Sequence, residues 1–253
     1  MKPKRTGLFY PLACGLLIIA GSAGAVLSMS FPSWADYQQP PEARPPNAPT
    51  DTTGGRDCGV SQNGLHLTPL APQQHIGQTH SSHPTFMWFV PVETSLKGEF
   101  QIYQRTAGER YQRLLAEPYE FESTQGFMAF TLPEEIEDLQ PGTDYVWQVL
   151  LRCGERPAEI YKVRAQLQVV EITDRLSEPL AIGLLDQANQ LAAAGLWYDA
   201  LALLSPLPVN DEAKGLRSQL LMSLADLEVA TEESSDTISH SQALRQIAQS
   251  HLE

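Results

Sequence analysis

The sequence has few cysteines and lacks the common signatures of catalysis. It contains three cysteines in 253 residues and no C-x-x-C pair, which excludes a thioredoxin-like redox site and a zinc ribbon. It has no G-x-S-x-G elbow, no H-E-x-x-H helix, no P-loop, no dinucleotide-binding glycine motif and no EF-hand loop. These absences exclude the enzyme classes that such motifs identify. A hydrolase with a dispersed active site stays open, because the members of a catalytic triad can lie far apart in sequence.

Positive charge is also scarce. Lysine and arginine number 17 against 30 aspartates and glutamates, so the formal net charge is −13. Nucleic acids and anionic membrane surfaces both require a cationic surface on the protein that binds them. We therefore expect neither as a partner. A soluble acidic surface accounts for the composition.

The N-terminus has the three parts of a secretory signal, which we assign to residues 1–35. Lys2, Lys4 and Arg5 precede a long apolar stretch, and small residues at positions 33 and 35 suit a signal peptidase. Cleavage before Asp36 would remove three cations and no acids, which takes the net charge to −16. We expect a periplasmic or extracellular protein. The alternative is an uncleaved N-terminal transmembrane anchor, because the apolar stretch is long enough to span a bilayer.

Export makes a disulfide bond between Cys58 and Cys153 the expected state of these two thiols. The bond would close a loop of roughly 95 residues, which by loop entropy alone contributes about 4–5 kcal/mol. Two unconnected thiols are the alternative.

The rest of the chain divides into four regions that differ in composition and hydrophobic pattern. Residues 36–64 are rich in proline and glycine and are expected to form a disordered linker. Residues 65–173 contain seven short segments with strand character, separated by turn residues, which is typical of an antiparallel sandwich. The expected strands are 65–70, 85–90, 100–105, 110–115, 127–132, 143–152 and 161–169.

One turn refines the expected fold of residues 65–173. Leu139, Pro141, Gly142 and Tyr145 are spaced as in the tyrosine corner of immunoglobulin and fibronectin type III domains. In such a corner the proline and glycine turn the chain, and the tyrosine hydroxyl bonds back to the backbone of the turn. The fold class expected is therefore an all-β immunoglobulin/fibronectin-like antiparallel sandwich followed by a small C-terminal α-helical hairpin.

The helical hairpin is assigned to residues 174–230. Apolar residues recur at helical spacing from Ala181 to Ala192, and Gly195 ends that helix. Further helices are expected at 196–204 and 211–227, and the segment 195–201 resembles the junction between the two helices of a tetratricopeptide repeat. Residues 231–253 are expected to form a flexible or weakly helical tail.

An ordered series of motifs runs through about residues 65–227. It consists of Leu67-Thr68-Pro69-Leu70, Gly77, Thr79, Pro84-Thr85-Phe86, Trp88-Phe89-Val90-Pro91, Leu132-Pro133, Leu139, Tyr145-Val146-Trp147, Cys153 and Gly195-Leu196-Trp197-Tyr198-Asp199-Ala200-Leu201. This series resembles a cyanobacterial family of unknown function, domain of unknown function nine-twenty-eight. The resemblance implies an exported protein. It implies no activity and no catalytic residues.

The best candidate for a ligand site is the group His75, His80 and His83. Three imidazoles on one loop can bind a divalent metal, which would make the chain a periplasmic metal-binding protein. Their spacing matches no known metal motif, so a polar loop that happens to carry histidines is the alternative. No other cofactor is expected.

Acidic and aromatic residues offer weaker candidates, for which we favour structural roles. The carboxylates at 134–138 and 117–122 are expected on solvated turns and strand edges. Trp88, Trp147 and Trp197 occupy apolar faces and are expected in the core rather than on a sugar-binding platform. Taken together, the sequence favours a non-catalytic module that interacts with an unknown protein of the cell envelope.

Overall fold

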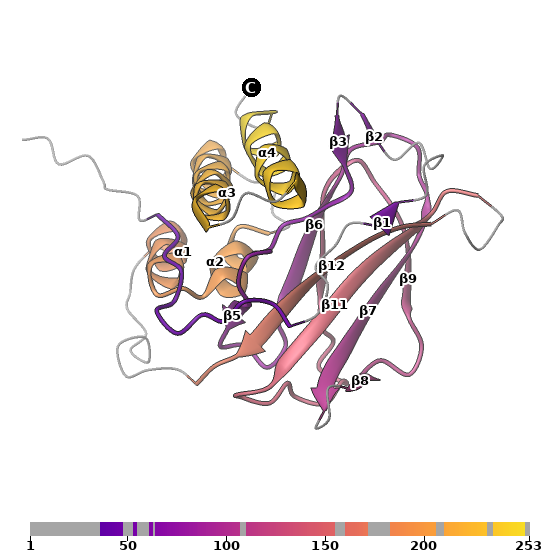
Figure 1. Cartoon of the computed structure of the whole chain (residues 1–253), viewed down its shortest axis with the longest axis horizontal. Coiled ribbons are helices and arrows are strands. Elements are labelled where there is room, and N and C mark those ends of the chain that lie inside the picture. The colour runs from indigo at the N-terminus through magenta and orange to yellow at the C-terminus, as the bar shows by residue number, and fades with distance from the viewer. Residues whose placement is uncertain are drawn as a thin grey trace, which may run out of the picture. The chain divides into compact units, whose positions relative to one another are not determined.

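The computed structural model describes residues 36–47, 53–54, 61–62, 64–106, 110–154, 160–171, 183–205, 210–231 and 235–250 (Figure 1). The predicted signal segment, residues 1–35, lies outside these ranges. Within them, no helix combines the length and the apolar character needed to cross a lipid bilayer.

The larger of the two main sheets is built around three long strands, β12, β11 and β7. Its strands run in the order β1-β12-β11-β7-β8, with β5 also paired to β12 and β9 also paired to β7. All these pairs are antiparallel except β5 with β12, which is parallel, so the sheet is mixed. The strands are β1 (Thr53–Gly54), β5 (Gly77–Thr79), β7 (Lys97–Thr106), β8 (Arg110–Arg113), β9 (Tyr119–Glu122), β11 (Asp144–Arg152) and β12 (Ile160–Val169).

The second main sheet has three antiparallel strands in the order β10-β6-β4, and a separate short pair joins β2 to β3. The strands are β2 (Ser61–Gln62), β3 (Leu65–His66), β4 (Thr68–Pro69), β6 (Thr85–Val90) and β10 (Gly126–Thr131). Hydrophobic alternation placed the long strands within a few residues of where they occur. It missed β5 and β9, which are short, and β1 and β2, which lie in the expected disordered linker.

Aromatic side chains fill the space between the two main sheets. Phe86 of β6 lies 5.0 Å from the ring of Phe100 on β7 and 5.5 Å from that of Trp147 on β11. Trp88, also on β6, packs against Phe100 and against Phe121 of β9. Apart from Phe121, each of these aromatic side chains is at most 1% exposed. Burial of this many large rings is the main favourable term in joining the sheets.

The turn before β11 has the hydrogen bond expected of its tyrosine. The backbone N–H of Gln140 donates to the hydroxyl oxygen of Tyr145 at 2.8 Å. Gly142 has φ +75°, which a residue with a side chain rarely adopts, and its N–H donates to the carbonyl of Val169 at 2.8 Å. The turn is thereby fixed to the end of β12.

In the part of the chain that the structure describes, four helices follow the sheets: α1 (Leu184–Ala193), α2 (Trp197–Leu203), α3 (Asp211–Thr231) and α4 (Ser235–Ser250). The expected flexible tail therefore contains a regular helix. Leu244, Ile247 and Ala248 of α4 are fully buried, at the i, i+3, i+4 spacing of a packed helix face. The prediction of a flexible or weakly helical tail allowed for a helix in residues 231–253 but not for one packed into the core, and the small hairpin is not confirmed.

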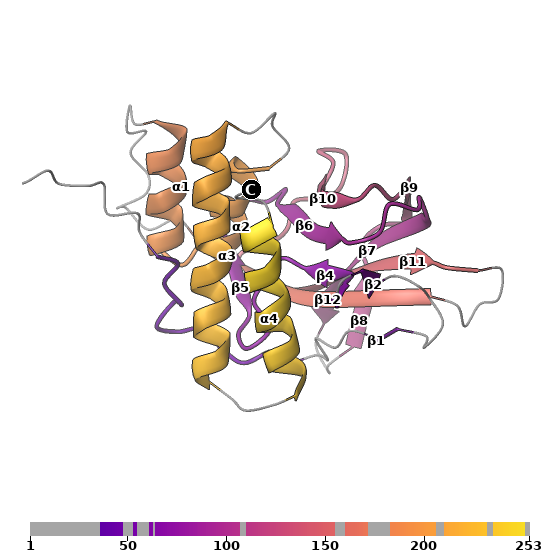
Figure 2. The same ribbon diagram turned by 90° about the horizontal axis from the view of Figure 1, so that it is seen from above.

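The helices lie to one side of the sheets (Figure 2), and α2 is the element in closest contact with them, through β5 and β6. Buried side chains of the helices and of the sheets belong to one continuous hydrophobic core. Helices and sheets therefore stabilise each other, and neither has a complete core by itself.

Residues 36–47, here called the N-terminal strap, pack onto this core although they were expected to be disordered linker. Tyr37 is 1% exposed and meets the ring of Trp197 edge-on at 4.9 Å. The N–H of Gln38 donates to the carbonyl of Ala192 at 3.1 Å, and the N–H of Ile76 donates to the carbonyl of Arg44 at 2.9 Å. Its proline-rich sequence prevents regular structure, but the strap is held by a buried aromatic ring and by single backbone hydrogen bonds.

Candidate functional site

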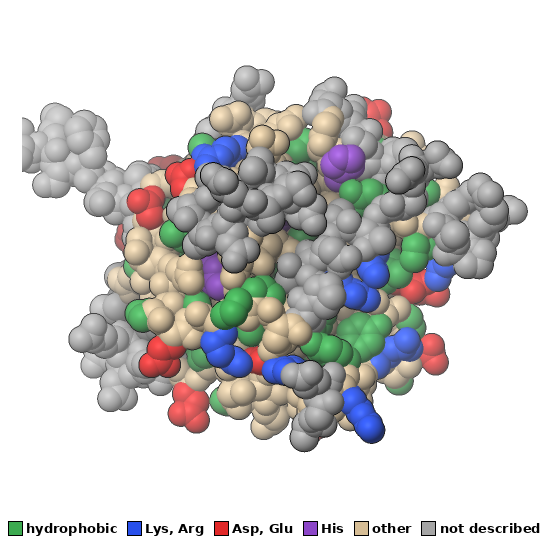
Figure 3. Space-filling view, viewed as in Figure 1, with side chains coloured by type: hydrophobic (Ala, Val, Ile, Leu, Met, Phe, Trp, Pro, Cys, Tyr) green, Lys and Arg blue, Asp and Glu red, His purple; other side chains and the backbone are tan. Residues whose placement is uncertain are grey.

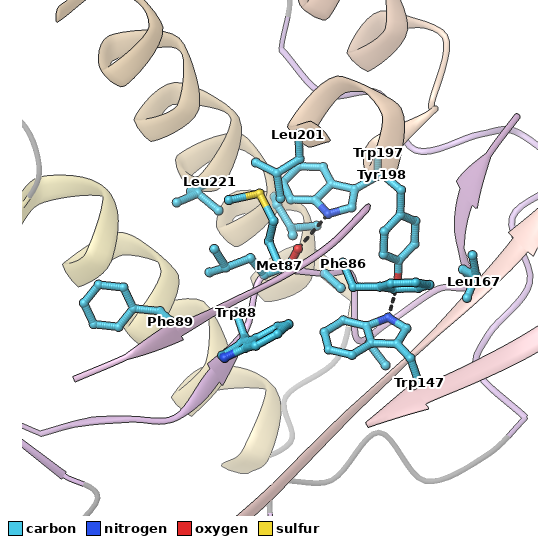
Figure 4. Packing of buried hydrophobic residues seen from close by; sticks show 14 of the residues in the cluster. Phe86, Met87, Trp88, Phe89, Trp147, Leu167, Trp197, Tyr198, Leu201 and Leu221 are labelled. Atoms are coloured by element: carbon cyan, nitrogen blue, oxygen red, sulfur yellow. Dashed lines mark hydrogen bonds between the residues drawn. The ribbon is translucent and has the colours of Figure 1, made fainter. Parts of the chain in front are cut away.

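The segment Trp197-Tyr198-Asp199 at the start of α2 is a structural anchor. The indole N–H of Trp197 donates to the carbonyl of Leu70 at 2.9 Å. The Tyr198 hydroxyl accepts from the indole of Trp147 and donates to the carbonyl of Gln166, both at 2.9 Å, as Figure 4 shows for the Trp147 bond. These bonds satisfy polar groups that would otherwise be buried without partners. The expected core position of Trp88, Trp147 and Trp197 is confirmed, since each is at most 1% exposed.

Asp199 continues this anchor toward the surface. Its carboxylate accepts from the Thr79 hydroxyl and from the His80 N–H, both at 3.0 Å. Nδ1 of His80 lies 2.9 Å from Oδ1 of the same carboxylate. The hydrogen bond to Asp199 raises the pKa of His80 above its ordinary value against a smaller opposing effect of burial. The pair is a partly exposed acid–histidine contact that ties β5 to α2.

The structure does not bring His75, His80 and His83 together. His75 is 2% exposed, and its Nε2 lies 2.7 Å from the Tyr37 hydroxyl. His83 Nε2 donates to the carbonyl of Ile136 at 3.0 Å. Among the described residues, no three histidine, cysteine, aspartate or glutamate side chains are grouped so that they could hold a metal ion. The predicted metal site is therefore not formed, because each of the three imidazoles has a different partner.

A second buried polar group lies where the helices meet the loop at 71–76. Glu228 of α3 is fully buried; its Oε1 accepts from the Gln73 N–H at 2.5 Å, and its Oε2 lies 3.5 Å from Nε2 of His240 on α4. Burial raises the pKa of Glu228 to about 8 and lowers the pKa of His240 to about 4. Burial likewise lowers the pKa of His75 to about 4. Both histidines and the carboxyl are thus held neutral near pH 7, as expected for titratable groups inside a core.

The remaining sequence candidates fall in different places. The carboxylates at 134, 135, 137 and 138 lie on the turn before β11, and those at 120 and 122 are exposed on β9. Cys153 is disulfide-bonded, and it lies just after β11. Cys58 is outside the described residues, so its pairing with Cys153 stays a prediction.

The outer face of the larger sheet, which is buried over much of β11 and exposed at β8, carries a group of cations around one carboxylate that the sequence did not single out. At the start of β11, Asp144 is 9% exposed and accepts from Arg44 of the strap at 2.7 Å and from the Asn47 amide at 3.1 Å. Arg105 of β7 approaches the same carboxylate at 3.8 Å. One buried carboxylate thus positions two guanidinium groups, of which half of the Arg44 side chain and a quarter of the Arg105 side chain stay exposed.

Tyrosines lie beside these arginines on the same face. Arg105 is directly opposite Tyr111 in the pairing of β7 with β8, and Tyr103 is directly opposite Arg113. Residues opposite each other, or two apart along a strand, project from the same face of a sheet. On the outer face of this hairpin, arginine and tyrosine therefore alternate along each strand and also face each other across the two strands. We call Tyr103, Arg105, Tyr111 and Arg113 the Arg/Tyr patch.

Tyr103 and Arg105 are two residues apart on β7 and so project from the same face. The other half of the Arg/Tyr patch depends on the register of β8, and Asp144 and Arg44 are 100 residues apart in the chain. Figure 3 shows lysine and arginine side chains gathered over the sheet, while most of the visible acidic side chains lie toward the edges of the view. This polar, partly cationic face is the best candidate for a binding surface among the described residues.

These features define a class of protein: a mixed β-sheet structure with a layer of four helices and one shared core. The sequence matches the family described as Domain of Unknown Function (DUF928) over residues 51–234, and the chain belongs to that family. No curated protein matches it.

Proposed function

We propose that this protein is an exported, non-catalytic module that binds another component of the cell envelope through the outer face of its larger sheet, at the edge where β8 is exposed. The observation that carries this proposal is the pair of arginines positioned by Asp144 on that face. An acidic chain that orders cations around one carboxylate presents them in fixed geometry, which favours recognition over nonspecific adsorption. Export itself and a cyanobacterial source are part of the proposal, and rest on the residues at 1–35 and on the family resemblance.

The finer fold assignment belongs to the same proposal. An immunoglobulin- or fibronectin-like sandwich is supported by the Tyr145 hydrogen bond to the preceding turn and by aromatic packing between the sheets. The expected sandwich is purely antiparallel, and this protein differs from it by the parallel pairing of β5 with β12. Folds of this kind serve many functions, so the fold alone does not indicate the ligand.

Photo-crosslinking in the cell envelope tests the proposal. Deletion of the helices would expose the shared core, so a truncated chain is unsuitable and single-site probes are needed. Among the described residues, the large hydrophobic side chains that are exposed are Tyr111 on β8, Tyr119 on β9 and Leu184 at the start of α1. A photoreactive residue at each site should capture an envelope component at Tyr111 and much less at Leu184.

Two results would contradict the proposal. Equal capture at all three positions would mean that the sheet face has no special role. Turnover of a panel of ester and glycoside substrates by the purified protein, abolished by His80→Ala, would show instead that the Asp199–His80 contact is catalytic.

A further inference from the structure

The Arg/Tyr patch has a charge and shape that restrict what it can bind. Among the described residues, this part of the sheet carries Arg44, Arg105 and Arg113 and one buried carboxylate, that of Asp144, while Glu120 and Glu122 of β9 pair with the other end of β7. The nearest further acid on the same strand, Glu99, is paired with Arg152. The local excess of positive charge stands against a formal net charge of −13 for the whole chain. The patch is therefore suited to an anionic ligand that contacts a small area rather than the whole protein surface.

Aromatic rings give the patch a second chemical property. Tyr111 is 41% exposed, and its hydroxyl donates to the Asn47 side chain at 3.5 Å, so the ring is held from one edge. Tyr103 is held more firmly, because Gln148 Nε2 donates to its hydroxyl at 3.1 Å. Neighbouring strands are about 5 Å apart, so each ring lies within reach of the same ligand as the guanidinium across from it.

We propose that the Arg/Tyr patch binds an acidic polysaccharide, with its carboxylates on Arg105 and Arg113 and a sugar ring on Tyr111. This inference rests on the proposed function and names the ligand of that same face. Guanidinium groups bind carboxylates in a planar, two-point geometry. A tyrosine ring offers an apolar surface with a polar edge, which suits the mixed surface of a sugar.

The distribution of charge favours a polysaccharide over a nucleic acid. Duplex DNA has a negative charge about every 1.7 Å along its axis and needs an extended cationic surface. Here the cations cover one hairpin and its neighbours, and the rest of an acidic protein repels a dense polyanion. A polymer with one carboxylate per sugar unit has more widely spaced charges and matches a patch with a few arginines.

Isothermal titration calorimetry with defined polymers tests the inference. The protein is purified from cells in its natural form. Polygalacturonate should bind and neutral dextran should not. Arg105→Gln combined with Arg113→Gln should weaken binding about tenfold, because each arginine contributes a screened charge contact. The matched control, Lys97→Gln with Lys214→Gln, removes the same charge from exposed or half-exposed positions outside the patch and should change affinity less than about twofold.

Tyr111→Ala separates a sugar site from a simple anion site. Loss of the ring should weaken polygalacturonate binding about fivefold, in line with the contribution of one exposed aromatic contact. A site that recognises only charge would be insensitive to it. Unchanged affinity in this variant would overturn the assignment of a sugar to the tyrosine.

Three other results would overturn the inference: no binding of polygalacturonate, equal losses in the double variant and its control, or tighter binding of oligodeoxythymidylate. If crosslinking at Tyr111 still captures an envelope component while polygalacturonate fails to bind, only the choice of ligand is wrong. If polygalacturonate fails to bind and crosslinking at Tyr111 captures nothing, the proposed function is wrong as well.

Discussion

The buried carboxyl of Glu228 should make the stability of this protein fall as pH rises, and Glu228→Gln should abolish that effect. The side chain is fully buried, and its pKa is raised from 4.5 in the unfolded chain to about 8 in the folded protein. Between these values the folded state holds a proton that the unfolded state has lost. The resulting stability is fully present below the unfolded pKa and is lost as pH rises through the folded pKa.

The magnitude follows from the size of the shift. One pKa unit corresponds to about 1.4 kcal/mol, so the free energy of unfolding should fall by about 3–4 kcal/mol between pH 5 and pH 8 through this one group. Glutamine keeps an oxygen that can accept from the Gln73 N–H but cannot ionise. The stability of Glu228→Gln relative to the wild type should therefore increase by that amount over the same interval.

His75 and His240 act in the opposite direction and in a different range. Their pKa values are lowered to about 4, so the stability they contribute is present above the unfolded value of 6.5 and is lost as pH falls from there toward 4. Both histidines are present in the wild type and in Glu228→Gln, so their effect cancels to first order in the difference between the two. Tyr37 also interacts with Glu228, but its pKa is raised above the ordinary tyrosine value, so it stays neutral throughout.

Urea denaturation at several pH values measures the effect directly. The control is Glu212→Gln, which removes an exposed carboxyl from the first turn of the same helix and should leave the pH dependence unchanged. Parallel stability curves for the wild type and Glu228→Gln would refute the reasoning, because they would mean that Glu228 is ionised in the folded protein at neutral pH.

Three further substitutions test how the helices are attached. Tyr198→Phe leaves the Trp147 indole and a buried carbonyl without their partner and should lower the free energy of unfolding by about 2–4 kcal/mol in urea denaturation. Gly195→Ala places a methyl group 2.5 Å from Cγ of Pro40 at a φ of +83°, so the melting temperature should fall, and protease cleavage within the strap should become faster than in the wild type. Leu244→Ala in α4 should cost about 2–5 kcal/mol if this helix belongs to the core. A change below 1 kcal/mol would mean that it does not.

Local patterns in the sequence predicted the long elements well and the short ones poorly. Alternation over β12 and apolar continuity over β6 located both strands, because these patterns are repeated enough times to be distinctive. Strand β5 has three residues, Gly77–Thr79, and depends on parallel pairing with the distant β12. No local pattern in three residues can indicate such a pairing.

Two errors came from treating composition as evidence of disorder. The strap is rich in proline, which excludes regular structure but does not exclude packing, and Tyr37 supplies the buried group that holds it. In α4, the acidic and serine-rich residues near 232–236 obscured the helical spacing of Leu244, Ile247 and Ala248 further along. Those three residues could have been recognised from their spacing alone.

The candidate sites were less predictable than the fold, because they depend on contacts between distant residues. The three loop histidines are close in sequence, yet His75 turns into the core and His80 is paired with Asp199, 119 residues away. The same limit applies to Asp144, whose partner Arg44 belongs to a segment expected to be disordered. Sequence spacing indicates which residues are near each other along the chain, but not which direction each side chain takes.

The position of the strap has a consequence for the order in which the chain can fold. Tyr37, close to the start of the described residues, packs against Trp197 as well as His75, and Ser223 of α3 donates to the Tyr37 carbonyl at 3.4 Å. The strap and the helices up to α3 must therefore both be present before the core can close. Contacts between residues so far apart make folding slow. If the protein is exported as proposed, this delay keeps the chain unfolded until nearly all of these residues have crossed the membrane.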